Sequence, residues 1–399
     1  MSSVFHRAAQ PLKAVSAEGC WITDSEGRRY LDAAGGAIVT GIGHGRAEIA
    51  DVVAAQMRQV EFVHASVFTT EVLEKYCSSL AALAPLAGAR IYPVSGGSEA
   101  TETVLKMARA YQLARGRPQR TTVLAREASY HGNTLGALDL SGRPALRQPY
   151  EPWLGRFVQL SEASDPEVIE QTIIAHDDVA AVMLEPISGA SRAGAVPPVE
   201  YWPAVAEICR RHDVLLIADE VMTGFGRTGK WFGTEHWAVS PDLMTAGKGA
   251  SSGYWPIGLA FASGSVFDAI GADFVHGFTF SHHPVGAAVG QAVLDIITRE
   301  RLVDAAETKG KRLRSALADA LPDAEIRGRG LLVGVVWESG EGTRAIVESA
   351  RRQGLLVYPA AIENAIVLGP PLVIDDAEID ELVDRLVAAV MPHASRPEV

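Results

Sequence analysis

The chain has 399 residues, of which 48% are hydrophobic and 21% are charged, and its formal net charge is −12. This length and hydrophobic content predict a globular protein with a core large enough for two domains. The negative charge, without any block of basic residues, argues against nucleic acid and anionic membranes as partners.

The cysteines and the N-terminus indicate the cellular compartment. Cys20, Cys77 and Cys209 are an odd number without close spacing, which argues against a disulfide framework and a zinc site. The opening residues, MSSVFHRAAQPLK, contain no apolar run of the length that a secretory signal needs, and no later run approaches a membrane span. We therefore expect a cytoplasmic protein.

The first two thirds of the chain are expected to form a hairpin followed by an α/β domain. The segment GCWITDSEGRRYLDAAGG predicts a hairpin that turns at Glu26-Gly27. From about residue 46 to 270, apolar runs alternate with helical patterns such as residues 201–212, as in a parallel sheet covered on both faces. The runs are continuously apolar, as buried parallel strands are: ARIYPV, TTVLAR, VAAVMLEP, VLLIADE and LMTAGK.

The pattern changes after about residue 288. A long helix is expected over residues 289–320, then the strand-like run GLLVGVVW, a second helix, the runs LLVYP and AIVLGPP, and a last helix capped by Asp375 or Asp376. We therefore expect a large α/β domain (46–288) and a small α+β domain (289–399). The N-terminal segment (1–45) is too short to fold alone and is expected to pack with the small domain.

Two motifs place polar groups at the ends of predicted strands. In VSGGSEATETVLKMARAY (94–111), a glycine turn leads into a helix near Ser98, whose first N–H groups suit a phosphate, although such a turn is more often a plain connection. In VLLIADEVMTGFGRTG (214–229), five apolar residues lead directly to Asp219, at the strand end where open α/β sheets bind ligands. A structural salt bridge and the protonated ring nitrogen of a ligand would each satisfy this carboxylate.

Two further motifs add an amine and an aromatic ring. Lys248, in LMTAGKGASSGYWPIG (243–258), follows another apolar run; a desolvated lysine can attack a carbonyl, whereas most loop lysines are solvated. Tyr130 and His131, in ASYHGNTLG (128–136), are explained equally well by core packing or by contact with a flat ligand. A phosphate cradle, an aromatic face, a carboxylate and a lysine together match the binding needs of pyridoxal 5′-phosphate.

The order of these motifs resembles that of the class III pyridoxal-phosphate-dependent aminotransferases, which include ω-amino acid, ornithine and amine:pyruvate transaminases. The likeness covers nearly the whole chain and includes SGGSEATE, YHG, LEPISG, ADEVMTGFGRTG, AGKGASSG, GFTFSHHPVGAA and GPPLVI. The resemblance implies fold type I of these enzymes, an α/β fold with a large domain built on a mainly parallel sheet and a smaller α+β C-terminal domain.

The resemblance also implies roles for single residues. Lys248 would form the Schiff base with the cofactor and then act as the acid and base that moves a proton, and Asp219 would pair with the pyridinium nitrogen. Amino transfer from an amine donor to a keto-acid acceptor would follow a ping-pong scheme.

The other implied cofactor contacts come from three segments and from a second subunit. The expected contacts are the phosphate-binding N–H groups of Gly97 and Ser98, the ring of Tyr130 stacked on the cofactor, the neighbouring His131, and Thr279 of GFTFSHHP, which would reach the phosphate of the partner subunit. A homodimer is then the minimal active unit. His276, His282 and His283 also suggest a metal site, but no carboxylates stand at matching spacing, so no metal is expected.

The chain departs from the family pattern at the substrate pocket. Members that take α-amino acids carry an arginine just ahead of PPL and a glutamate shortly after EP, where this chain has Val367 and Ala190. Because both members of the ion pair are missing, no buried charge is left without a partner, which indicates a changed substrate pocket. We therefore expect a donor without an α-carboxylate, such as a primary amine, a diamine or an ω-amino acid. Tyr358 stands where amine transaminases place a mobile arginine. Arg227 and Arg143 are candidates to bind the acceptor carboxylate.

Three other functions remain open at this point: two other enzyme activities and one non-catalytic role. An aminomutase or a decarboxylase on the same scaffold needs the same cofactor contacts, because these contacts stabilise any carbanion beside the imine. Consumption of a keto acid with one-to-one amine formation favours transfer, whereas carbon dioxide release or reaction without an acceptor favours the others. A non-catalytic cofactor-binding module is expected to have lost Lys248 or Asp219, and both are present.

Overall fold

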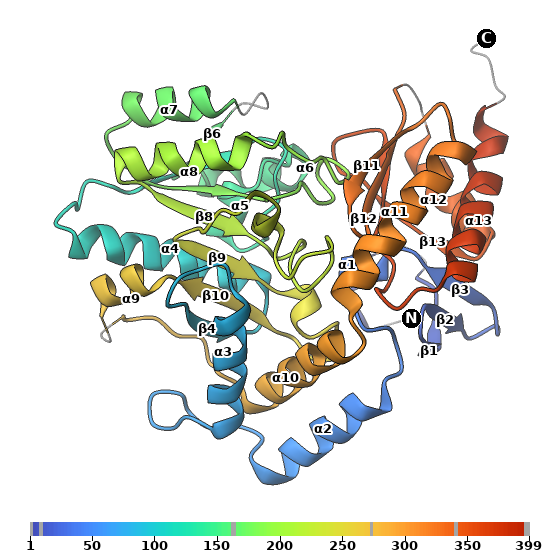
Figure 1. The fold of residues 1–399 in the computed structure, drawn as a ribbon, viewed down its shortest axis with the longest axis horizontal. Coiled ribbons are helices and arrows are strands. Elements are labelled where there is room, and N and C mark those ends of the chain that lie inside the picture. Colours follow the sequence, from blue (N-terminus) through green and yellow to red (C-terminus); the bar gives the residue numbers. More distant parts are fainter. Residues whose placement is uncertain (1–2, 8–10, 161–164, 272–273, 339–341, 395–399) are drawn as a thin grey trace.

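The computed structural model describes residues 3–7, 11–160, 165–271, 274–338 and 342–394. Its larger part is built on a seven-stranded sheet in the order β4-β10-β9-β8-β7-β5-β6 (Figure 1). The strands are β4 Arg90–Val94, β5 Thr122–Arg126, β6 Val158–Leu160, β7 Val179–Leu184, β8 Leu215–Asp219, β9 Leu243–Ala246 and β10 Gly258–Ala262. Neighbours from β6 to β9 are parallel, and β10 is antiparallel to both β9 and β4. The predicted α/β fold with a mainly parallel sheet is confirmed.

Helices cover both faces of this sheet, which explains why its strands are continuously apolar. In β7, Ala181 and Met183 belong to a hydrophobic cluster with residues of α4 (Gly97–Ala114). Val182 and Leu184 belong to the other cluster, which includes residues of α8 (Tyr201–His212) and α10 (Pro284–Arg299). Because successive side chains of a strand point to opposite faces, a strand buried on both faces has no polar positions to alternate with.

The parallel strands end at one edge of the sheet, and the predicted functional residues follow those ends. Asp219 is the last residue of β8, and Lys248 follows β9. Tyr130 follows β5, and Ser98 lies in the first turn of α4, just after β4. Residues far apart in the sequence therefore meet at the carboxyl edge, where open α/β sheets bind ligands.

The C-terminal residues are built on a separate antiparallel sheet in the order β11-β12-β15-β14. Its strands are β11 Glu325–Arg329, β12 Leu332–Val336, β15 Ala365–Leu368 and β14 Tyr358–Pro359, and its helices are α11 Leu302–Ala320, α12 Thr343–Arg352 and α13 Asp376–Ala394. A third sheet joins β1 Ala14–Glu18, β2 Trp21–Asp24 and β3 Arg29–Asp32 to β13 Leu355–Leu356, which pairs with β3 (Figure 1). The predicted hairpin turn is present, with Gly27 at φ 80°.

The expectation of one long helix over residues 289–320 was wrong. The chain forms α10 and α11 as separate helices, and Arg301 between them has φ 53°. A right-handed helix cannot contain a residue in this left-handed conformation, so the chain changes direction there. The expected domain boundary at residue 288 falls inside α10, and the division of the chain into domains stays a prediction.

The start of the last helix is specified by its own side chains. The backbone N–H of Glu378 donates to Asp375 Oδ1 at 2.8 Å, and the N–H of Asp375 donates to Glu378 Oε2 at 3.0 Å. This reciprocal pair is a capping box, which satisfies two N–H groups at the helix start. Asp375 is therefore the cap, and Asp376 is the first helical residue.

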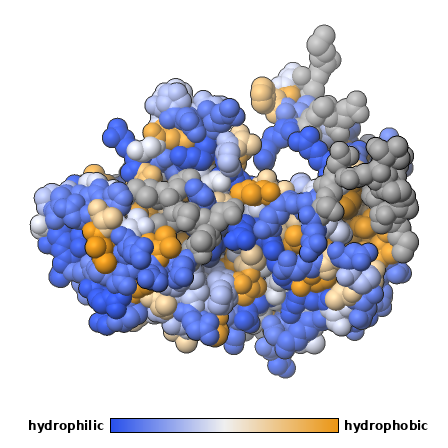
Figure 2. Space-filling view, turned by 90° about the horizontal axis from the view of Figure 1, so that it is seen from above, coloured by the Kyte–Doolittle hydropathy of each residue, from blue (hydrophilic) through white to orange (hydrophobic). Residues whose placement is uncertain are grey.

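The surface seen in Figure 2 is mainly hydrophilic, with hydrophobic residues in small separate patches. This view looks from above onto the molecule of Figure 1, where α7 (Pro166–Ala175) lies near the top. Within the described ranges, no helix is both long and apolar enough to cross a membrane.

Candidate active site

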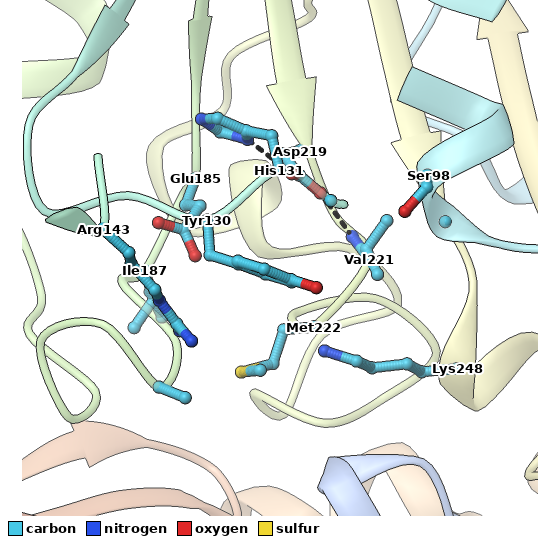
Figure 3. A pocket seen from close by; sticks show the side chains of 13 residues that line it. Ser98, Tyr130, His131, Arg143, Glu185, Ile187, Asp219, Val221, Met222 and Lys248 are labelled. Carbon is cyan, nitrogen blue, oxygen red and sulfur yellow. Dashed lines mark hydrogen bonds and ion pairs between the residues drawn. The ribbon is translucent and has the colours of Figure 1, made fainter. Parts of the chain in front are cut away.

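A pocket of about 180 Å³ lies at the carboxyl edge of the large sheet (Figure 3). It is lined by six of the seven residues expected to contact the cofactor: Gly97, Ser98, Tyr130, His131, Asp219 and Lys248. They come from α4, from the end of β8 and from the segments that follow β5 and β9. The fold thus gathers four separate sequence motifs around one cavity.

The amino group of Lys248 points into this pocket, towards the space beside Tyr130 and Met222 (Figure 3). Lys248 has φ 43°, an uncommon conformation for a residue with a side chain. The next residue is a glycine, and a Cβ added at Gly249 would lie 2.9 Å from the Phe225 side chain. Burial lowers the pKa of Lys248 to about 8, against the opposing effect of the Asp219 charge. A larger fraction of the amine is therefore neutral and nucleophilic near neutral pH.

Asp219 is held rigidly at the end of β8 and is only 4% exposed. His131 Nδ1 donates to its Oδ2 at 2.6 Å, and Thr245 Oγ1 and the N–H of Val221 donate to its Oδ1 at 3.0 and 3.1 Å. Figure 3 shows the contacts with His131 and Val221. Three donors from three segments fix the carboxylate, and His131, expected beside the cofactor, lies against Asp219.

The start of α4, with Gly97 and Ser98, forms another side of the pocket. The first N–H groups of a helix have no acceptor within the helix and lie at the positive end of its dipole, which suits an anion. Ser98 Oγ accepts a hydrogen bond from the N–H of Asn133 at 3.1 Å. A Cβ added at Gly132, which has φ 139°, would lie 2.6 Å from that oxygen, so only glycine lets the loop carrying Tyr130 approach the helix this closely.

Glu185 is a pocket residue that the sequence reasoning missed. It follows β7 and is 8% exposed; its Oε1 accepts from the N–H of Gly189 at 3.3 Å, and its Oε2 is buried without a hydrogen-bond partner among the described residues. Burial raises the pKa of this carboxyl. The signal was present, because the run VAAVML leads directly to Glu185 as VLLIA leads to Asp219.

The remaining sequence candidates lie in different environments. Ala190 lines the pocket, whereas Val367 is fully buried in β15 and does not line it. Tyr358 is half-buried in β14. Thr279 is exposed and lies outside the pocket of its own chain, so its expected contact with a partner subunit stays a prediction.

The histidines of residues 276–283 make ordinary contacts. His276 Nε2 lies 2.9 Å from Thr103 Oγ1, and the rings of His282 and His283 contact aromatic side chains. In the part of the chain that is described, no group of three or more His, Cys, Asp or Glu side chains is placed to hold a metal ion.

Known proteins match the chain along nearly its whole length. The family model "Aminotransferase class-III" matches residues 4–390. The putrescine–pyruvate aminotransferase of Pseudomonas aeruginosa is 34% identical over 94% of this chain and 91% of its own. An (S)-enantioselective ω-transaminase from Thermomicrobium roseum is 35% identical with a TM-score of 0.91, covering 96% of this chain and 93% of that one.

A third comparison involves the cofactor. The structure of an amine transaminase from an uncultivated Pseudomonas species, in its pyridoxal-phosphate-bound form, is 32% identical with a TM-score of 0.90 and covers 98% of both chains. The family match, the relatives and the fold agree with the motif order in the sequence. This chain belongs to the class III aminotransferase family.

Proposed function

We propose that this aminotransferase uses pyridoxal 5′-phosphate to move an amino group from a primary amine or ω-amino donor to a keto-acid acceptor in two half-reactions. The observation that carries the proposal is that Lys248 and Asp219 line one buried pocket together with the start of α4. The family is pyridoxal-phosphate-dependent, and a structural neighbour is described with that cofactor bound.

The pocket residues fit this cofactor group by group. The unsatisfied N–H groups at the start of α4 suit its phosphate, and the fixed carboxylate of Asp219 suits a protonated ring nitrogen. The exposed face of Tyr130 suits a flat ring, and the amine of Lys248, with its lowered pKa, suits an aldehyde.

Each protein residue then has a defined task. Bound pyridoxal phosphate supplies an electron sink for the carbanion formed next to the substrate nitrogen. Asp219, held by His131 and Thr245, keeps a proton on the ring nitrogen through its negative charge. Lys248 would hold the cofactor through its amine and, once a donor amine takes that place, would accept the proton of the substrate carbon at Nζ and return it. A keto acid reverses these steps and regenerates the starting enzyme.

The donor class follows from missing charges in the pocket. Ala190 lines the cavity at the position of the expected glutamate, and Val367 is buried away from it at the position of the expected arginine. An α-carboxylate placed beside the reacting carbon would therefore lack the cation that α-amino-acid enzymes supply there. A donor without this carboxylate avoids that desolvation cost.

Isopropylamine and L-alanine are a matched pair for testing the donor, because they differ by a methyl group in place of the carboxylate. Because alanine is also the product of amino transfer to pyruvate, we expect both amines to bleach the holoenzyme, and isopropylamine or a diamine to do so at least as fast as L-alanine at equal concentration, since the usual cation for an α-carboxylate is missing. Efficient reaction with α-amino acids alone would contradict the donor class. Carbon dioxide release, or product formed without a keto acid, would favour the decarboxylase or aminomutase instead.

We also propose that the active unit is a homodimer. Large hydrophobic side chains are exposed on two neighbouring segments: Phe62, Val67 and Phe68 on one, and Val275 and Phe280 on the other. The rings of Phe62 and Phe280, 6.1 Å apart, join these segments into one surface. Thr279 is exposed beside Phe280. A second copy covering this apolar surface would bring Thr279 towards its pocket, in line with the role that the family resemblance implies.

Thr279→Ala is expected to weaken pyridoxal phosphate binding by about 10- to 100-fold, because one hydrogen bond to a charged group is lost. Thr279→Ser keeps the hydroxyl and is expected to bind almost normally. The dissociation constant can be measured by titrating the apoprotein, and the mass in solution by sedimentation. A monomer that binds the cofactor normally would rule out the dimer proposal.

A further inference from the structure

The side chain of Arg143 is oriented towards the candidate active site by two contacts. Arg143 lies just before α6 (Pro144–Arg147) and lines the pocket together with Lys248. Its Nε donates to Ser191 Oγ at 3.0 Å, and its guanidinium carbon lies 4.4 Å from the centre of the Tyr130 ring. These contacts fix one edge and one face of the guanidinium, and the end of the side chain is directed into the cavity (Figure 3).

The charge of Arg143 is not neutralised by the protein. Within the described residues no carboxylate forms an ion pair with it, although the nearby Arg147 pairs with Asp139 at 3.3 Å. Its positive charge is among the causes that lower the pKa of Lys248, after burial. A half-buried cation without a partner is costly unless an anion binds to it.

The other arginine that the sequence offered for this role is already occupied. Arg227 is 4% exposed, and its Nη1 donates to the backbone oxygens of Leu331, at 3.1 Å, and Pro370. It does not line the pocket. Arg227 therefore holds chain segments together, and Arg143 is the guanidinium that faces the cavity.

Figure 3 shows the guanidinium end of Arg143 and the amino end of Lys248 directed into the same space from opposite sides, with Met222 between them. A ligand whose reacting carbon lies at Lys248 would extend across the Met222 side chain towards Arg143. Ala190, next to Ser191, contributes no carboxylate that would compete for this guanidinium.

We propose that Arg143 binds the carboxylate of the keto-acid acceptor and that Ser191 and Tyr130 orient its guanidinium group. The proposal rests on the function proposed above and assigns the acceptor half-reaction to a residue outside the segment ahead of PPL. A guanidinium presents a planar fork that matches the two oxygens of a carboxylate, which an amine donor lacks. Arg143 therefore distinguishes the acceptor from the donor.

The test compares pyruvate with propanal, a three-carbon aldehyde acceptor that carries no carboxylate, on fully loaded holoenzyme. For Arg143→Gln we expect kcat/KM for pyruvate to fall by about 10- to 100-fold, mainly through KM, and the value for propanal to stay within about threefold. Arg143→Lys is expected to lose less for pyruvate, because it keeps the charge but not the fork. Ser191→Ala is expected to lower the ratio of pyruvate to propanal activity several-fold.

Two controls separate this proposal from its alternatives. Arg115→Gln removes an exposed arginine at the end of α4 and is expected to change neither acceptor. The donor half-reaction, followed as bleaching of the visible band before any acceptor is added, is expected to be normal in Arg115→Gln and to change far less than the reaction with pyruvate in the Arg143 and Ser191 variants. An equal loss for pyruvate and propanal, or no loss for either, would overturn the role of Arg143. Failure of the unaltered enzyme to bleach with any amine would overturn the proposed function, and this proposal with it.

Discussion

Replacing Lys248 by alanine is expected to abolish amino transfer, with kcat/KM falling by roughly 10⁴-fold or more. Two contributions are lost together. The amine that attacks the aldehyde is removed, and so is the base that moves the proton. No other lysine lines the pocket in the described part of the chain, so no neighbouring amine is placed to substitute.

The measurement combines absorbance and kinetics. The variant, incubated with pyridoxal phosphate and passed through a desalting column, is expected to lose the visible band that the unaltered protein keeps. Lys230→Ala is the matched control, because Lys230 is an exposed lysine outside the pocket. A Lys248→Ala variant that keeps more than about a hundredth of the activity would show that the pocket works without this amine.

The large sheet and the placement of Asp219 and Lys248 were predictable from the sequence for one physical reason. A parallel strand buried on both faces must be continuously apolar, so its end is marked by the first polar residue. Parallel strands also end at the same edge, so residues 219 and 248 were expected together, and both line the pocket.

Features that depend on tertiary contacts were not predictable in this way. The break at Arg301 has neither glycine nor proline to mark it, although Arg301 takes a left-handed conformation at the start of α11. Strand β10 is as apolar and as buried as the parallel strands, but it runs antiparallel to β9. It passes so close to the start of α4 that a Cβ on Gly258 would lie 2.1 Å from the Gly96 oxygen.

The side-chain contacts within the pocket also depend on the tertiary fold and were not predictable from the sequence. The sequence named Arg143 and Arg227 as equal candidates for the acceptor carboxylate, since neither local pattern differs from that of a solvated arginine. Only the fold shows that Arg227 is occupied by backbone oxygens, whereas Arg143 lies against Tyr130 and forms no ion pair with any carboxylate that the structure describes. Contacts such as those of Arg227 with Leu331 and Pro370, which are 104 and 143 positions away, carry no local sequence signal.

Replacing Asp219 by asparagine is expected to reduce kcat for both half-reactions by roughly 100- to 1,000-fold while the visible band remains. Asparagine has nearly the same shape and can accept the hydrogen bonds from Thr245 and Val221, so the pocket keeps its form. It cannot supply the negative charge that keeps the ring nitrogen protonated. Because Lys248 is intact, covalent attachment of the cofactor should survive.

Asp32 provides a closely matched control for this substitution. It is 1% exposed and accepts from His44 Nε2 at 3.0 Å, so it forms an aspartate–histidine pair like that of Asp219 and His131, but with a half-buried histidine and outside the pocket. Asp32→Asn is expected to lower the melting temperature without a comparable loss of turnover. Equal losses of turnover in both variants would mean that Asp219 acts by supporting the folded structure, as Asp32 does, and not through the chemistry. A rate loss confined to Asp219→Asn would instead tie this carboxylate to the chemistry, because the two substitutions remove the same charge from equally buried sites.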